Sequence, residues 1–161
     1  MTYTPPSSLL HGLSVERAQL YGMPHIGASY RGADANTHRL DEGAVCSVCG
    51  APASNAHHEP PKGTCPYFAL QTEWGMFMLK PALIAMCGSG TTGCHGGRHQ
   101  GLVTFRWEWF EDEAAEAWWS GWLLAHGYEP HDPRLYELGQ WRVTTEDGTA
   151  TRSAAFQERH R

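Results

Sequence analysis

The chain has 161 residues, of which 41% are hydrophobic and 11% aromatic, so it can bury the core of one globular domain and is not a disordered chain. Its longest apolar run, around residues 83–86, is far too short to span a membrane, and the N-terminal residues lack the basic and apolar regions of a signal peptide. We therefore expect an intracellular, cytoplasmic protein with no membrane partner.

The formal net charge is −5, which argues against a nucleic-acid partner because such a partner usually binds a basic face. The charge is unevenly distributed, however. Residues 108–161 carry five Arg against eleven acidic residues, whereas residues 46–107 carry two Lys and two Arg against two Glu. The middle of the chain is therefore mildly basic, and a nucleic-acid partner for that segment stays open.

Residues 1–43 predict an N-terminal arm followed by a short helix. The first part is rich in Pro and Ser, which favours an extended conformation. Ser14 can cap a helix that runs to Leu20, where a Gly-Met-Pro sequence soon ends it. Residues 25–43 have no clear period, so we expect a loop there with short ordered pieces.

Two cysteine pairs are the first metal signal in the chain. Cys46 and Cys49 form a Cys-x-x-Cys pair, and Cys87 and Cys94 form a second pair. Each short loop can direct two sulfurs at one ion, which is typical of a tetrahedral zinc site. In a reducing compartment, metal binding explains these spacings better than disulfides do. We therefore predict a structural Zn²⁺, and we expect the remaining cysteine, Cys65, to be a small buried or loop thiol.

The segment around these pairs predicts two strands and a short helix. Residues 53–58 are predicted to form a strand that ends near consecutive prolines, since proline cannot continue a ladder. Residues 63–80 form a long excursion, which we expect to pack over the core. Residues 82–86 predict a buried strand, residues 88–93 a flexible spacer loop, and residues 94–101 a helix that metal binding stabilises.

The histidines of this segment predict a second ion. His95 and His99 lie on one face of the predicted helix because they are at positions i and i+4. His57 and His58 are adjacent on a strand, so their side chains point to opposite sides of it. One of this pair can bind the ion while the other stays free as a candidate general base.

The C-terminal third predicts a strand, a helix and a hairpin. Residues 103–107 are predicted to form the strand. Residues 112–126 are predicted to form one helix, whose three tryptophans pack on the core and which Gly127 ends. Residues 141–149 predict a hairpin that turns at Asp-Gly, and the polar tail after it is expected to fray. Taken together, these predicted strands and helices give an α+β fold.

Three segments, CSVCG, AHHEPP and LIAMCGSGTTGCHGGRH, resemble the HNH endonucleases, whose ββα-metal core is also called a His-Me finger. The chain looks closest to the small HNH nucleases of actinobacterial phages and prophages. The likeness covers residues 44–101 and extends more loosely through AHGYEPHDP and WRVTTEDGT, whereas residues 1–43 contribute nothing to it. The resemblance implies a zinc-stapled ββα-metal core at residues 44–101 and a helix-and-hairpin extension at residues 102–161 that packs on it.

The resemblance also implies residue roles. It makes His58 the general base for hydrolysis of DNA phosphodiester bonds. Lys62 and Arg98 become phosphate contacts, although each is equally a candidate for a solvated surface charge. The implied ligands are His57, His95 and His99 for a catalytic Mg²⁺, Mn²⁺, Ni²⁺ or Zn²⁺, and Cys46, Cys49, Cys87 and Cys94 for the structural Zn²⁺. The implied partners are DNA and phage packaging or DNA-processing proteins, in a bacterial host.

One position departs from the family's pattern. The family commonly has an asparagine before the leucine of the second strand, where it braces the loop that carries the base, but this chain has Ala82. Either another group braces that loop or catalysis is weakened. A catalytically silent, zinc-stabilised DNA- or protein-binding module is therefore an alternative hypothesis. A third hypothesis places all seven ligands in one multinuclear zinc cluster.

Overall fold

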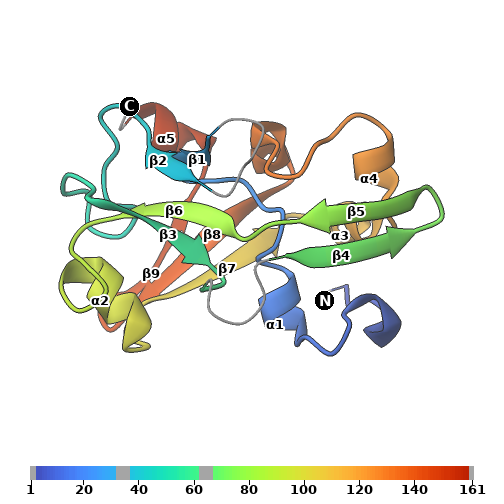
Figure 1. Ribbon diagram of the computed structural model, residues 1–161, viewed down its shortest axis with the longest axis horizontal. Coiled ribbons are helices and arrows are strands. Elements are labelled where there is room, and N and C mark those ends of the chain that lie inside the picture. The colour runs from blue at the N-terminus through green and yellow to red at the C-terminus, as the bar shows by residue number, and fades with distance from the viewer. Residues whose placement is uncertain (1–2, 32–36, 62–66, 160–161) are drawn as a thin grey trace.

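The computed structural model describes residues 3–31, 37–61 and 67–159, over which the chain is an α+β protein of small antiparallel sheets and short helices (Figure 1). The strand pair β3–β6 and helix α2 lie at one end of the long axis, and the β4–β5 hairpin lies at the other (Figure 1). None of the helices in the described residues has the length and apolar character needed to cross a membrane.

The N-terminal part contains the turn η1 (Ser7–Leu9) and helix α1 (Val15–Ala18). The Ser14 side chain accepts a hydrogen bond from the Arg17 N–H at 3.2 Å, which confirms the predicted helix cap.

Two short strands follow, β1 (Ala28–Tyr30) and β2 (His38–Leu40), and they pair antiparallel. The sequence indicates only short ordered pieces in this part of the chain. Strands of this length contain too few alternations to show a period.

The β3–β6 pair lies beside both groups of predicted ligands. β3 (Asn55–Glu59) and β6 (Ala82–Met86) are antiparallel, with Glu59 opposite Ala82. β3 ends where Pro60 follows, as expected from the missing N–H of proline. β6 is buried along its whole length, and α2 (Gly93–His99) follows it after a short turn. The predicted strands and helix of this segment are therefore confirmed.

The predicted excursion between these strands is a hairpin of β4 (Phe68–Thr72) and β5 (Gly75–Leu79). One of its faces lies in the core, where Leu70 and Leu79 are fully buried. The other face is open, and Met76 on it is 59% exposed. The expectation of packing over the core is therefore confirmed for one face of the hairpin only.

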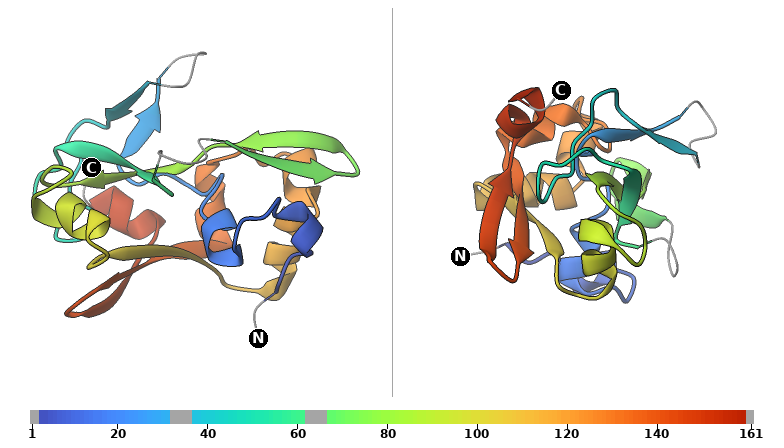
Figure 2. Two further views of the ribbon diagram at one scale, coloured as in Figure 1. Left: turned by 60° about the horizontal axis from the view of Figure 1, so that its bottom comes forward. Right: turned by 90° about the vertical axis from the view of Figure 1, so that its left-hand side faces the viewer.

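The C-terminal part forms a three-stranded sheet of β7 (Thr104–Trp109), β8 (Gly139–Thr145) and β9 (Gly148–Arg152). β8 and β9 are joined by a two-residue turn at Glu146 and Asp147, which confirms the hairpin and places its turn one residue before the predicted Asp-Gly pair. Figure 2 shows that this hairpin and the β1–β2 hairpin project from opposite sides of the molecule.

The single helix predicted at residues 112–126 is wrong, because the chain forms α3 (Asp112–Trp119) and α4 (Trp122–Ala125) instead. Gly121 separates them with a φ of 86°, which glycine adopts without steric cost. A Cβ atom at this position would lie 2.4 Å from Thr72 Cγ2 on the β4–β5 hairpin. Close approach of that hairpin therefore accompanies the break in the helix.

Residues 154–159 of the polar tail form a helix, contrary to the prediction that the tail frays. After the turn η2 (Pro133–Glu137) and the β8–β9 hairpin, the chain ends in α5 (Ala154–Arg159). Phe156 of α5 is buried, and the Arg152 guanidinium lies 4.6 Å above its ring. One aromatic side chain in an otherwise polar segment anchors this helix.

Aromatic residues from all parts of the chain build the core. Trp118 and Trp119 are buried, as predicted, whereas Trp122 is 47% exposed because α4 starts a new direction. The indole N–H of Trp141 donates to the Pro24 carbonyl at 2.9 Å. This buried hydrogen bond joins the C-terminal sheet to the N-terminal part.

Candidate metal centres

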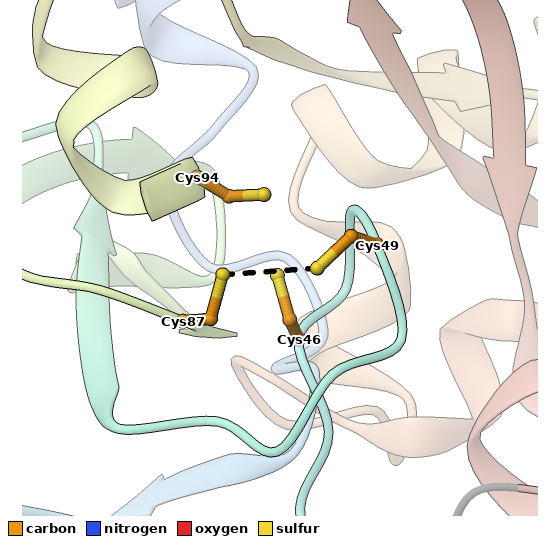
Figure 3. A group of neighbouring side chains, drawn as sticks. All are labelled: Cys46, Cys49, Cys87 and Cys94. Carbon is orange, nitrogen blue, oxygen red and sulfur yellow. Dashed lines mark hydrogen bonds between the residues drawn. The ribbon is translucent and has the colours of Figure 1, made fainter. Parts of the chain in front are cut away.

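The four predicted zinc ligands converge on one point. Cys46 and Cys49 lie in the loop before β3, Cys87 follows β6, and Cys94 lies in the first turn of α2. Their sulfur atoms all lie within 4.8 Å of one another, and the side chains turn toward a common centre (Figure 3). The sulfurs of Cys49 and Cys87 are 3.7 Å apart. A tetrahedron with Zn–S bonds of ~2.3 Å has edges of about 3.8 Å, so this spacing fits zinc.

Local turns position the sulfurs. Gly50, with a φ of 80°, closes the turn after Cys49, and the Val48 N–H donates to the Cys46 sulfur at 3.4 Å. The spacer after Cys87 is a tight hydrogen-bonded turn rather than a flexible loop, because the Thr92 hydroxyl lies 2.9 Å from that of Ser89. This turn brings the start of α2 back to the end of β6.

Two of the thiols, Cys46 and Cys94, are poorly suited to carry charge without an ion. Burial raises the pKa of Cys46 and of Cys94, whereas a backbone hydrogen bond with Cys94 lowers the pKa of Cys87. A bound dication would stabilise all of these thiolates together. The donor set therefore fits a structural metal such as zinc.

The three predicted histidine ligands also converge. His57 lies on β3, and His95 and His99 lie on α2. The Nε2 atom of His95 is 3.1 Å from His57 Nδ1 and 3.1 Å from His99 Nε2, and the three nitrogens lie within 4.8 Å of one another. Burial, followed by the neighbouring imidazoles, lowers the pKa of His95. Neutral imidazoles with converging nitrogens are a ligand set for a divalent ion.

The cysteines and histidines form two groups rather than one. Among the described residues, the seven predicted ligands are therefore not gathered into a single cluster. This separation is the arrangement expected for one structural and one functional ion, rather than for a multinuclear cluster.

The sequence analysis missed Glu59, which is fully buried beside the histidine group. Its carboxylate accepts hydrogen bonds from His57 Nε2 at 3.1 Å and from the Arg98 guanidinium, with Nη2 of Arg98 at 2.8 Å. Burial would raise the pKa of Glu59, but the bonds from His57 and Arg98 lower it. The spacing of two residues from His57, which puts both side chains on one face of a strand, is the signal that could have revealed it.

Of the two predicted phosphate contacts, Arg98 and Lys62, only Arg98 is among the described residues. The Arg98 guanidinium pairs with Glu59 rather than standing alone on the surface, and this pairing raises its pKa. Lys62 lies outside the described residues, as does Cys65.

His58 lies on the other side of β3 from the three ligands. Its ring centroid is 4.9 Å from that of His38 and 6.3 Å from that of Tyr30. His25 and His131 stack at 3.9 Å on the far side of Tyr30. The predicted division of the His57-His58 pair between two faces is therefore confirmed.

His25, His38, His58 and His131 form a second histidine group. A cavity of about 350 Å³ opens beside it, with Tyr30, Lys80 and His131 among the lining residues. A larger concavity of about 790 Å³, whose lining includes Glu16, Glu108 and Asp112, contains none of the predicted ligands. The two histidine groups thus lie at the smaller cavity and at the contact between β3 and α2.

Comparisons of the chain with protein-family models, with curated proteins and with solved structures gave no match. A function is therefore inferred from the residues of the two ligand groups and from the elements that hold them.

Proposed function

We propose that the chain is a metal-dependent endonuclease of the HNH type, which hydrolyses DNA phosphodiester bonds. The observation that carries the proposal is the convergence of the His57, His95 and His99 nitrogens within 4.8 Å, next to a separate group of four cysteine sulfurs. Both groups lie on or directly beside β3, β6 and α2, which follow one another in the order of a ββα-metal core with the β4–β5 hairpin inserted between the strands.

In this proposal the cysteines are scaffold. They join the loop before β3 to the end of β6 and the start of α2, so one zinc ion would hold together the elements that carry the histidines. α2 has little stability of its own, because it is one short helix with Gly96 and Gly97 in its middle.

The chemistry of the histidine group favours a transition-metal ion. Mg²⁺ prefers oxygen ligands and keeps several waters, whereas imidazole nitrogens suit Zn²⁺, Ni²⁺ and similar ions. When bound, such an ion supplies charge neutralisation for the phosphorane and the leaving oxygen.

The side chains of the chain itself supply the proton transfer. Within the proposal, His58 takes the proton from the attacking water, since imidazole changes charge between about pH 5 and pH 8. His58 is the backbone neighbour of the ligand His57, but its side chain lies on the other side of β3, so the proposal requires the attacking water to lie where both faces of the strand can be reached. The mildly basic middle segment agrees with a DNA substrate.

The test is cleavage of supercoiled plasmid in the presence of Zn²⁺, Ni²⁺, Mn²⁺ or Mg²⁺. The His58→Ala variant should cleave roughly 10²-fold more slowly or worse, because the general base is lost, while its metal content stays unchanged. His126→Ala, which removes an exposed histidine directly after α4, is the matched control and should cleave at the wild-type rate. Equal rates for His58→Ala and the wild type would remove His58 from its proposed role.

A catalytically silent zinc-stabilised binding module is the second candidate, and Ala82 in place of the family's asparagine favours it. The number of ions separates the two. A silent module keeps the cysteine-bound ion and shows no cleavage with any of the cations, whereas the nuclease binds a second ion through the histidines.

A further inference from the structure

The Glu59 carboxylate is a buried charge. Its hydrogen-bond partners are the ligand His57 and Arg98, which lies on the helix of the other two ligands. The Glu59 side chain has no exposed surface, and an ionised carboxylate in such a place is stable only when it is paired and hydrogen-bonded. His57 and Arg98 supply those bonds. The position is therefore built around the carboxylate rather than tolerating it.

The bond from His57 selects one form of its imidazole. A carboxylate only accepts hydrogen bonds, so His57 Nε2 must carry the proton that it donates to Glu59. In the neutral ring, Nδ1 then carries the lone pair, and this atom faces His95 Nε2 at 3.1 Å. Glu59 thereby aims a free lone pair of His57 at the point where the three imidazoles meet.

The bonds from Arg98 fix the helix. Arg98 lies on α2 between the two histidines of that helix, and its guanidinium contacts both carboxylate oxygens of Glu59. A two-pronged bond of this kind fixes orientation as well as distance. It ties the last residue of β3 to the helix that carries His95 and His99.

The position opposite Glu59 is Ala82, the residue that replaces the family's asparagine. Residues directly opposite in an antiparallel pair point to the same face of the sheet. Ala82 is fully buried and has only a methyl group, which leaves the polar bracing of this face to Glu59 and Arg98.

We propose that Glu59 and Arg98 form a positioning pair that sets the tautomer of His57 and fixes α2 against β3, in place of the brace that is absent at Ala82. The inference rests on the proposed metal site and deepens it. Carboxylates that hold a ligand histidine through its other nitrogen orient the ring and raise its basicity.

The experiment measures metal binding rather than cleavage. The protein is prepared with zinc on the cysteines, and a second equivalent of Zn²⁺ is titrated against a chromophoric competitor. Glu59→Gln should weaken this second site by about 10- to 100-fold, since the ring loses its charged acceptor. Glu108→Gln is the matched control and should leave the affinity unchanged. Glu108 also pairs with an arginine, Arg142, but this pair lies on the β7–β8 sheet, which carries none of the histidine ligands.

A spectroscopic measurement separates positioning from general stability. Nitrogen chemical shifts of the imidazole should show the Nε2-protonated tautomer of His57 in the metal-free wild type and a mixture of tautomers in Glu59→Gln. Arg98→Lys keeps the positive charge but loses the two-pronged bond, so it should weaken the second site while the His57 tautomer stays the same.

Unchanged affinity together with an unchanged tautomer in Glu59→Gln would overturn the inference, as would a wild-type protein that binds no second ion. Loss of affinity in Glu59→Gln from a wild type that cleaves no DNA would uphold the inference and count against the nuclease. If the wild type cleaves DNA and Glu59→Gln binds zinc as tightly as the wild type, the nuclease proposal is upheld and the inference about Glu59 is contradicted.

Discussion

His25 and His131 are buried histidines that the sequence gives no reason to single out. The Nδ1–H of His131 donates to the Met23 carbonyl at 2.7 Å, and its Nε2 atom is shielded from solvent. His25 Nδ1 accepts from the Leu83 N–H at 2.8 Å. Burial lowers the pKa of His131 to about 4 and holds that of His25 well below its ordinary value. Both rings are therefore neutral at physiological pH.

This burial makes stability depend on pH. The unfolded chain binds a proton at His131 near pH 6.5, whereas the folded chain does so only near pH 4, so stability is full above about pH 6.5 and falls as the pH drops toward 4. From His131 alone, the loss between pH 7.5 and pH 5 should be about 2 kcal/mol.

His131→Asn tests this prediction, because asparagine tolerates the φ of 67° at this position and does not titrate in this range. Denaturant unfolding at pH 7.5 and pH 5 should show a smaller loss of stability in the variant than in the wild type. Zinc release acts on both proteins and cancels in the comparison. An identical pH dependence of the two proteins would contradict the prediction.

At the scale of elements, most segments follow local signals. Besides the C-terminal helix α5, the departure from them is the helix predicted at residues 112–126. Its tryptophans and first-turn acids favour one continuous helix, and a glycine inside such a pattern lowers helix propensity by only about 1 kcal/mol. The break at Gly121 accompanies close approach to Thr72, a residue far away in sequence. No local pattern contains that information.

Gly121→Ala should therefore be strongly destabilising. It adds a Cβ atom both to a left-handed backbone and to a space that Thr72 already fills, for a total of about 2 to 4 kcal/mol. Gly12→Ala is the matched control, since Gly12 has the same φ of 86° but no atom within 4 Å of the new Cβ, and about 1 kcal/mol is expected. The free energy of unfolding in urea measures both, and equal values would show that the Thr72 contact costs nothing.

At the scale of the whole molecule, the C-terminal extension holds the other parts in place. Arg152 of β9 donates to the Ser47 carbonyl and, at 3.0 Å, to the Val48 carbonyl, both between the first two zinc ligands. Tyr136 donates to the His25 carbonyl at 3.0 Å. Residues from all three predicted segments enter one buried cluster, and among the described residues the extension contributes no member to either candidate ligand group.

Arg152→Ala should loosen the Cys46-x-x-Cys49 turn, because two carbonyls in that turn lose their donors. We expect zinc to pass to a chelator severalfold faster in this variant. Arg142→Ala, on the neighbouring strand β8, removes an arginine that pairs with Glu108 instead and should release zinc at the wild-type rate. Equal release rates in Arg152→Ala and the wild type would show that the extension does not support the zinc turn.

Local patterns in the sequence were enough to predict the two candidate ligand groups and the elements that carry them. A Cys-x-x-Cys turn, two histidines on successive helical turns and an alternating strand are local arrangements, so their geometry follows from residues a few positions apart. This is why the seven ligand positions and the two faces of β3 could be predicted.

The side chains that support those groups follow from the way separate elements pack together. The Glu59–Arg98 pair, the stacked His25 and His131, and the contact of Arg152 with the zinc turn each join residues that are distant in the chain. Such pairs depend on how separate elements pack against one another, and packing is set by the whole core rather than by any local pattern. The sequence motifs therefore predict the candidate ligands, whereas the side chains that support them depend on the packing of the fold.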